Sequence, residues 1–286
     1  MTGMLFLCAT PIGNLKDITK RVLDTLTEAD LIAAEDTRNS MKLLNHYQIR
    51  TPLTSYHEYN KVDKARVLID QLLTGKNIAL ITDAGTPAIS DPGEVLVRMC
   101  QESGVTVTSL PGPSACITAL SLSGLSTRRF CFEGFLPADK KERKAIIKEM
   151  REESRTIILY EAPHHLEKTL EELVEALGER KITICRELTK KFETIFPTTL
   201  TAALEYYRIE EPRGEYVLVL EGKSLKEKRQ EEIASWSDLT IEEHMSFYES
   251  GGMEHKDAMK QVAKDRGVGK RDIYRILHGS SSVGPV

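Results

Sequence analysis

The chain has 286 residues, of which 41% are hydrophobic and 29% are charged. This length can bury a sizeable core, and it favours two domains or one large domain with an appendage. The formal net charge of −4 gives no general attraction to a polyanion, so any contact with RNA would need a local basic surface.

Cysteine usage and hydropathy argue against further classes. The five cysteines include no C-x-x-C pair, which disfavours both a disulfide framework and a zinc site. No apolar stretch reaches the roughly 20 residues of a membrane-spanning helix, and the first residues lack the basic region of a signal peptide. We therefore expect a cytoplasmic protein that needs no metal and has no membrane partner.

The first half of the chain alternates short apolar runs with amphipathic segments, which is typical of an α/β domain with a parallel sheet. The strands are predicted at residues 4–8, 31–34, 78–81 and 105–107. Apolar residues at helical spacing predict helices at 19–26 and 64–73. A small, polar segment at 123–129 reads as a linker, so we assign residues 1–122 to an N-terminal α/β domain.

The same pattern predicts a second α/β domain over residues 123–223. Its strands are expected at 130–132, 156–160, 181–185 and 216–220, with helices at 140–151 and 166–177. From residue 224 the pattern is helical only, with helices expected at 227–235, 241–250 and 255–266. We therefore predict a small helical module over 224–278 and a disordered tail over 279–286.

Three loops rich in glycine and proline follow predicted strands, at residues 9–14, 83–93 and 110–115. In open α/β sheets ligands bind beyond the carboxyl ends of the strands, so these loops together predict a cleft. Each loop alone could be an ordinary turn. The sequence has no Rossmann glycine fingerprint, no P-loop, and no zinc-protease or serine-hydrolase motif, which disfavours nucleotide hydrolysis and hydrolase chemistry.

A series of short motifs, in order over most of residues 4–222, resembles the tetrapyrrole-methylase superfamily. They are A-T-P-I-G-N (9–14), E-D-T-R (35–38), S-Y-H-E (55–58), D-A-G-T-P-A-I-S-D-P-G (83–93), P-G-P-S-A (111–115), E-G-F-L-P (133–137), Y-E-A-P-H (160–164), C-R-E-L-T-K (185–190) and R-G-E (213–215). Three of them, E-D-T-R, Y-E-A-P-H and C-R-E-L-T-K, resemble the superfamily's ribosomal RNA methyltransferase branch, which methylates the 2′-hydroxyl of a decoding-centre cytidine in small-subunit RNA.

The resemblance implies a two-domain fold that binds the methyl donor S-adenosylmethionine in the cleft between the domains, and it implies a homodimer. Pro11 is expected on the floor of the donor site. The other residues expected at the donor are Ala84, Gly85, Thr86, Ile89, Ser114 and Ala115 from the first domain and Tyr160, Glu161, Leu188, Glu215 and Tyr216 from the second. Small residues suit this task because the donor is then held by closely approaching backbone groups.

Methyl transfer to a ribose hydroxyl needs alignment, exclusion of water and, if required, a base. Our candidates for this role are Asp36 and His57, with Glu35 and Glu58 as further candidates. Asp36 could equally be the N-terminal cap of a helix that includes residues 41–44, and a cap or turn hydrogen bond is the alternative for each of the others.

Basic residues give candidates for RNA contact in all three parts of the chain. They are Arg38, Lys42 and Arg50 in the first domain, Lys140, Lys141, Arg143, Lys144 and Lys148 in the second, and Lys256, Lys260, Lys264, Arg266, Lys270, Arg271 and Arg275 in the helical module. The segment from Ala258 to Tyr274 resembles a helix-turn-helix around Gly267 and Gly269. The alternatives are a solvated helix face for the charges and a packing appendage for the module.

The sequence is compatible with three functions. The first is an RNA 2′-O-methyltransferase, which the branch motifs and the basic module favour. The second is a methyltransferase of the same superfamily acting on a tetrapyrrole or on a protein. The third is a non-catalytic regulator that senses a ligand and binds nucleic acid through its helix-turn-helix; only this one would fail to transfer a methyl group.

Overall fold

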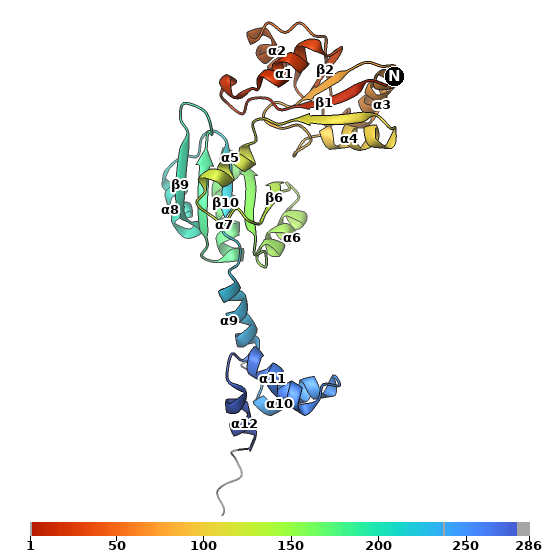
Figure 1. The fold of residues 1–286 in the computed structure, drawn as a ribbon. Coiled ribbons are helices and arrows are strands. Elements are labelled where there is room, and N and C mark those ends of the chain that lie inside the picture. Colours follow the sequence, from red (N-terminus) through yellow and green to blue (C-terminus); the bar gives the residue numbers. More distant parts are fainter. Residues whose placement is uncertain (1, 237, 279–286) are drawn as a thin grey trace, which may run out of the picture. The chain divides into compact units, whose positions relative to one another are not determined.

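The computed structural model describes residues 2–236 and 238–278. The predicted disordered tail, 279–286, lies outside the described residues. The chain divides into two compact units, Met1–Gly222 and Lys223–Val286. The first unit contains two five-stranded sheets, and the second contains helices (Figure 1).

The first sheet is entirely parallel. In spatial order its strands are β3 (Leu53–Ser55), β2 (Leu31–Ala34), β4 (Ile78–Ile81), β1 (Met4–Cys8) and β5 (Thr106–Leu110). The apolar runs at 4–8, 31–34 and 78–81 form strands as predicted. The strand expected at 105–107 begins one residue later and continues to Leu110, and the short strand β3 was not predicted.

Helices cover both faces of this sheet, as parallel connections require. On one face lie α1 (Lys20–Glu28) and α2 (Thr37–His46), with the short helix η1 (Leu15–Asp17) before α1. On the other face lie α3 (Lys61–Leu73) and α4 (Gly93–Glu102). The helix predicted at 19–26 is α1, and the hydroxyl of Thr19 caps it by accepting from the N–H of Val22.

The second sheet is mixed: β6 and β7 are parallel, and the remaining pairs are antiparallel. In spatial order its strands are β6 (Phe130–Phe135), β7 (Thr156–Glu161), β10 (Tyr216–Leu220), β8 (Lys181–Arg186) and β9 (Thr194–Thr199). The four predicted strands are confirmed, and β9 is additional.

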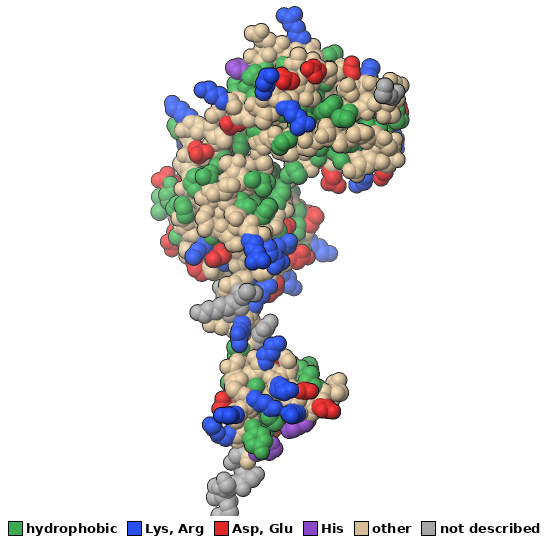
Figure 2. All heavy atoms as spheres, in the orientation of Figure 1, with side chains coloured by type: hydrophobic (Ala, Val, Ile, Leu, Met, Phe, Trp, Pro, Cys, Tyr) green, Lys and Arg blue, Asp and Glu red, His purple; other side chains and the backbone are tan. Residues whose placement is uncertain are grey.

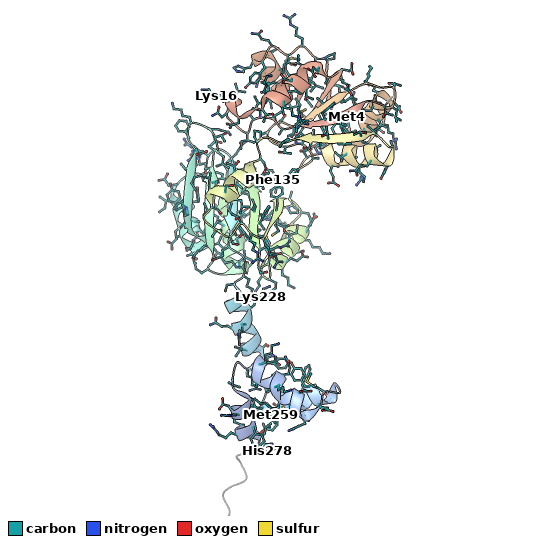
Figure 3. All side chains as sticks on the ribbon, in the orientation of Figure 1. Met4, Lys16, Phe135, Lys228, Met259 and His278 are labelled. Carbon is teal, nitrogen blue, oxygen red and sulfur yellow. The ribbon has the colours of Figure 1, made fainter. Side chains whose placement is uncertain are left out.

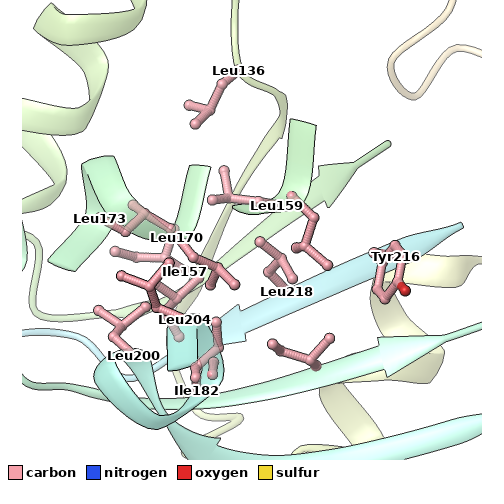
Figure 4. Packing of buried hydrophobic residues seen from close by; sticks show 14 of the residues in the cluster. Leu136, Ile157, Leu159, Leu170, Leu173, Ile182, Leu200, Leu204, Tyr216 and Leu218 are labelled. Atoms are coloured by element: carbon pink, nitrogen blue, oxygen red, sulfur yellow. The ribbon is translucent and has the colours of Figure 1, made fainter. Parts of the chain in front are cut away.

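One face of the second sheet is covered by α6 (Lys140–Met150), α7 (Leu166–Leu177) and α8 (Leu200–Ile209), with the short helix η2 (Pro163–His165) before α7. Figure 4 shows Leu170 and Leu173 of α7 packed together with Leu200 and Leu204 of α8 above the strands. Burying such leucines stabilises the fold by roughly 1.5–3 kcal/mol each.

The opposite face carries α5 (Ala115–Leu122), which packs against β7, β8 and β10. Ile12, from the loop after β1, lies in the same buried cluster as Leu188 and Val217 of the second sheet. The carboxyl edge of the first sheet is therefore fixed to the second sheet by apolar contact. The domain boundary at residue 122 stays a prediction, although α5, which precedes it, packs on the second sheet.

The second unit is formed by α9 (Leu225–Ser235), α10 (Ile241–Ser250), α11 (His255–Asp265) and α12 (Lys270–His278). Its core is built from residues such as Met245, Met259, Val262 and Ile273; Figure 3 labels Met259 within it. A capping box between Thr240 and Glu243 begins α10. No helix among the described residues is long and apolar enough to span a membrane.

Candidate functional site

The loop after β4 has an unusual backbone conformation that its own residues stabilise. Gly85 has φ +86°, and Ala88 and Ser90 have φ +68° and +61°. Such angles cost a non-glycine residue about 1–3 kcal/mol. The carboxylate of Asp91 offsets this cost by accepting the N–H groups of Ala88 (3.0 Å), Ile89 (3.3 Å) and Gly93 (2.8 Å).

This loop is joined to the two other glycine- and proline-rich loops. Thr10 and Gly85 exchange two backbone hydrogen bonds, of 2.9 and 3.0 Å. The hydroxyl of Thr86 donates to the carbonyl of Pro113 at 3.0 Å. Because β4, β1 and β5 are neighbours in the sheet, their three loops meet at its carboxyl edge, which is where ligands bind in folds of this kind.

A cavity of about 420 Å³ lies between these loops and the second sheet, and its size is typical of a small-molecule site. Every residue predicted at the donor except Pro11 lines it: Ala84, Gly85, Thr86, Ile89, Ser114, Ala115, Tyr160, Glu161, Leu188, Glu215 and Tyr216. Pro11 instead lines a neighbouring cavity of about 330 Å³, together with residues of α2.

Small residues form part of the first-sheet side of the larger cavity. A Cβ on Gly85 would lie 3.3 Å from Cγ2 of Ile12 and 3.6 Å from the carbonyl oxygen of Pro113, so any side chain there would take space at the cavity wall. Ala84, Ser90, Ser114 and Ala115 are the other small residues of this wall. A ligand on this side can therefore approach backbone N–H and C=O groups closely, and it also meets the side chains of Glu35, Asp83 and Thr86.

The second sheet contributes aromatic residues and a buried carboxylate. The Tyr160 hydroxyl accepts the N–H of Cys116 at 3.2 Å, and burial raises the pKa of Tyr160, so it stays neutral. Phe135, which Figure 3 labels at the end of β6, is 59% exposed and stands edge-on to Tyr160 with ring centroids 5.5 Å apart. Aromatic faces of this kind suit a planar heterocycle such as adenine.

Glu161 lines the cavity but is only 5% exposed, and both of its carboxylate oxygens have partners within the protein. One carboxylate oxygen accepts the N–H of Ala162 at 2.8 Å, and the other accepts the hydroxyl of Thr169 at 2.5 Å. Thr169 in turn accepts from Arg143, whose guanidinium also forms a 2.6 Å ion pair with Glu172. Arg143 is thus engaged inside the domain, and the expectation that it contributes to an RNA-binding surface is not supported by its contacts.

Of the candidate bases, Glu35 lines the larger cavity, where its carboxylate accepts the hydroxyl of Thr82 at 2.8 Å. Asp36 caps α2, which is the alternative considered for it: its carboxylate accepts the N–H of Arg38 at 2.8 Å. Hydrogen bonds from the backbone and side chain of Arg38 hold the pKa of Asp36 below its usual value, which makes it a weak base.

His57 and Glu58 line neither of these two cavities. The Nε2 of His57 lies 3.3 Å from the side-chain amide of Asn60, and its backbone N–H donates to the same side chain at 2.8 Å. Glu58 forms an ion pair with Lys61. Both contacts lie in the turn that begins α3. They agree with the alternative to a catalytic role, in which these side chains form turn hydrogen bonds.

The candidate RNA-binding residues lie on several helices. Arg38 and Lys42 are exposed on α2, and Lys140 and Lys141 are exposed in the first turn of α6. In the helical module, Lys270 is half-buried and Arg271 is exposed, both at the start of α12. Figure 2 shows Lys and Arg side chains gathered on the visible face of this module.

Sequence reasoning missed several residues that line the larger cavity, among them Ile12, Ser90, Asp91, Phe135 and Asp83. Phe135 lies within the motif E-G-F-L-P, and Asp83 begins the motif after β4. The position of these two residues within the family motifs was the one signal in the sequence that could have indicated them. Asp83 lines both the larger and the smaller cavity, a property that depends on folded geometry. No group of three or more potential metal ligands is found in the described part of the chain.

Comparison with known proteins identifies one family and relatives that share one name. Residues 4–204 match the family described as Tetrapyrrole (Corrin/Porphyrin) Methylases. The Ribosomal RNA small subunit methyltransferase I of Halalkalibacterium halodurans is 49% identical over 96% of this chain and 95% of that protein. The protein of the same name from Bacillus subtilis is 46% identical over 96% of this chain and 94% of that protein.

Solved structures with low sequence identity share the fold. Diphthine synthase aligns with a TM-score of 0.59 at 15% identity, covering 78% of this chain and 90% of that one. Uroporphyrin-III-C-methyltransferase from Thermus thermophilus aligns with a TM-score of 0.55 at 16% identity, covering 76% of this chain and 94% of that one. The chain belongs to the tetrapyrrole methylase family, and its relatives within that family include the ribosomal RNA small subunit methyltransferases I.

Proposed function

We propose that this chain uses S-adenosylmethionine to methylate the ribose 2′-hydroxyl of a cytidine in the decoding centre of small-subunit ribosomal RNA. The observation that carries the proposal is the 420 Å³ cavity, whose lining contains nearly all the residues predicted to hold the donor. The names of the relatives, at 46–49% identity, support ribosomal RNA as the acceptor. Such a reaction would take place in the cytoplasm, where the ribosomes are.

When bound, the donor supplies an electrophilic methyl group on a sulfonium. Ala84, Gly85 and Thr86 would hold its amino-acid portion and ribose through backbone groups, and the apolar wall that contains Leu188 and Tyr216 would hold its adenine. The protein's contribution is to align the donor with the acceptor and to exclude water from the reacting atoms.

The acceptor RNA would meet basic side chains outside the donor cavity. Arg38 and Lys42 are exposed on α2, and Lys140 and Lys141 are exposed on α6. Lys270 and Arg271 stand at the start of α12, at the position of a recognition helix in a helix-turn-helix. We assign all six to phosphate contact. We also propose the homodimer that the resemblance implies, which sedimentation velocity would test.

The proposal is tested by methyl transfer from labelled donor to small ribosomal subunits from cells that lack this methylation, and to the same RNA without proteins. We expect the label in one nucleoside, recovered as 2′-O-methylcytidine, with the adjacent phosphodiester resistant to alkali because its 2′-oxygen is blocked. Donor binding, measured by calorimetry, should be unchanged by a metal chelator. Loss of binding on chelation would contradict the metal-free donor site.

The two alternatives give different results in the same assay. A tetrapyrrole methyltransferase would label uroporphyrinogen but not RNA, and a protein methyltransferase would label ribosomal or translation-factor protein. A ligand-sensing regulator would bind the donor and label none of these substrates. If the label is found on a base rather than on a ribose oxygen, the assignment as an RNA methyltransferase stands and the assignment of the 2′-hydroxyl as acceptor is wrong.

A further inference from the structure

The smaller cavity, of about 330 Å³, lies between the loop after β1 and one face of α2. The α2 residues that line it include Asn39, Lys42, Leu43 and His46, whose spacing of three and four residues places them on one side of the helix. The hydroxyl of Tyr47 donates to the carbonyl of Leu15 at 2.6 Å and ties the end of α2 to the opposite wall. The cavity wall thus combines the charged side chains of Lys42 and Asp83 with apolar surface from Pro11, Leu15 and Leu43.

The two cavities are neighbours and share lining residues. Thr82 and Asp83 line both of them. The paired backbones of Thr10 and Gly85 separate them, since Thr10 lines the smaller cavity and Gly85 the larger one. A group in the smaller cavity can thus approach a ligand in the larger cavity beside the carboxylate of Asp83.

The Asp83 carboxylate is oriented by two hydrogen bonds. One oxygen accepts the N–H of Asp36 at 3.3 Å, and the other accepts the side-chain amide of Asn39 at 3.4 Å. The amide oxygen of Asn39 accepts from the ammonium of Lys42 at 3.3 Å, which fixes the way the amide points. Loss of hydration raises the pKa of Asp83, and the negative charges of Glu35 and Asp36 raise it further, against the opposing effect of the Asn39 hydrogen bond.

We propose that the smaller cavity receives the acceptor nucleotide and that Asp83, at the junction of the two cavities, is the general base that takes the proton of the attacking hydroxyl. This inference rests on the function proposed above. Lys42 and His46 lie on the helix face where the nucleotide's phosphate would bind, and Pro11, Leu15 and Leu43 supply apolar surface for its sugar and base.

The step balances with the groups named. The ribose hydroxyl gives its proton to the Asp83 carboxylate while a lone pair of its oxygen forms the new O–C bond. The C–S bond breaks, its electron pair stays on sulfur, and the sulfonium becomes a neutral thioether. A carboxylate with a raised pKa is a better base than an ordinary aspartate, which agrees with the surroundings of Asp83.

The neighbouring carboxylates are less suited to this role. Asp36 is committed to the N–H and guanidinium of Arg38. Glu35 lines the donor cavity alone, and its carboxylate accepts from Thr82. Of the three, only Asp83 borders the space available to donor and acceptor together.

The test compares Asp83→Asn, Asp83→Glu and Glu35→Gln with the wild-type chain and with Asp63→Asn as control. Asp63 is an exposed aspartate of α3 that lines neither cavity. The measurements are kcat on small subunits, KM for RNA and donor affinity by calorimetry. The pH dependence of kcat is also recorded for every variant, because the ionisable side chains of Glu35, Asp36, Lys42 and His46 face the same region.

We expect Asp83→Asn to lower kcat by roughly 10²–10⁴-fold while donor affinity stays within about threefold. It should also abolish the rise of kcat with pH that a base with a single pKa produces. Asp83→Glu should recover part of kcat, and Lys42→Met should raise KM for RNA more than it lowers kcat. A kcat within threefold of wild type for Asp83→Asn, or the large loss appearing in Glu35→Gln instead, would overturn the assignment.

The wild-type product separates this inference from the function on which it rests. If the wild-type chain labels a ribose 2′-oxygen and Asp83→Asn does so equally fast, only the assignment of Asp83 is wrong. If the wild-type chain labels no ribose oxygen, the proposed function is wrong, and the role assigned to Asp83 is then wrong as well.

Discussion

Gly13 and Lys190 are packed so closely that a Cβ on Gly13 would lie 2.4 Å from the Cγ of Lys190. The first belongs to the loop after β1 and the second to the loop after β8, so this contact joins the two sheets. Lys190 also forms ion pairs with Glu187 at 2.9 Å and Glu215 at 2.7 Å, and Glu215 lines the donor cavity. The absence of a side chain at Gly13 thus allows Lys190 to hold one wall of that cavity.

Replacing Gly13 by Ala should weaken donor binding, because Lys190 would have to leave its two carboxylate partners. We expect a loss of about 1–2 kcal/mol, or roughly 5–30-fold in dissociation constant, measured by calorimetry with S-adenosylmethionine. Lys190→Met should give a similar loss. The neighbouring Lys191, which lies over the ring of Phe192, provides the control Lys191→Met, and equal losses from Lys190→Met and Lys191→Met would contradict the role given to Lys190.

Gly85 offers a separate test of the donor cavity, and a second glycine controls for backbone strain. Gly85→Val should abolish measurable donor binding, because its side chain would occupy the cavity wall in a conformation with φ +86°. Gly85→Ala should weaken binding less. Gly104 has φ +71° and no heavy atom within 4 Å of an added Cβ, so Gly104→Ala carries similar strain away from the cavity.

Both alanine variants should lose about 1 kcal/mol or more of stability from the positive φ, measured by thermal unfolding. Only the Gly85 variants should lose donor affinity. Unchanged donor affinity in a folded Gly85→Val protein would show that the donor does not lie against this loop.

The strands most readily predicted from sequence are those whose apolar runs are buried on both faces. β4 and β10 consist entirely of buried residues, and such runs are visible without knowing their neighbours. β3 and β9 contain no buried residue, and β9 includes Pro197, which disfavours a strand. Those two strands form through pairing with β2 and β8, which the local sequence does not encode.

A similar limit applies to the helices and to the site. α5 carries apolar residues on several sides, because it lies between loops of the first sheet and a face of the second, so it lacks an amphipathic period. In the site, residues that act through backbone groups were predicted from motif resemblance. Asp36 and Asp83 are both aspartates at strand ends, so the sequence does not distinguish their roles. Only the folded structure shows that Asp36 caps a helix and that Asp83 borders two cavities.

The helical module contains a histidine that should make its stability depend on pH. His244 is 0% exposed, and its Nδ1 accepts from the guanidinium of Arg266 at 3.1 Å, which requires the neutral ring. Burial, and then the charge of Arg266, lower the pKa of His244 below its ordinary 6.5. Below about pH 6.5, His244 binds more protons in the unfolded chain than in the folded one, so the free energy of unfolding decreases as the pH falls. Above about pH 6.5 the ring is neutral in both states, and His244 adds no further pH dependence.

The ring of Trp236, the chain's one tryptophan, stacks on His244 with centroids 3.9 Å apart. Denaturant unfolding followed by Trp236 fluorescence should therefore show a lower midpoint at about pH 5.5 than at about pH 7.5. His244→Gln should be less stable at both pH values and should show a smaller difference between them. His255→Gln, which alters an exposed histidine of the same module, should retain the difference; equal wild-type midpoints at the two pH values would contradict the role of His244.

The helical module should contribute to RNA methylation but not to donor binding. Every residue that lines the two cavities precedes Gly222, and Met1–Gly222 is a compact unit, so deleting residues 224–286 should leave donor affinity near that of the full chain. Methylation of small subunits should nevertheless fall, because the module's lysines and arginines would no longer bind phosphates. We expect RNA affinity to drop roughly tenfold or more and to depend less steeply on salt, by about 0.7–0.9 in the logarithmic slope per lost phosphate contact.

Charge reversal at two positions separates this effect from a loss of packing. Lys270→Glu with Arg271→Glu changes residues at the start of α12, while the core residue Ile273 stays in place. The pair should reproduce part of the loss and part of the reduced salt dependence. Lys76→Glu with Arg98→Glu changes the net charge equally at exposed positions of the first unit and should have a much smaller effect, since those residues line neither cavity. If the truncated chain methylates small subunits as fast as the full chain at both low and high salt, the module is a packing appendage, and its basic residues have no part in RNA recognition.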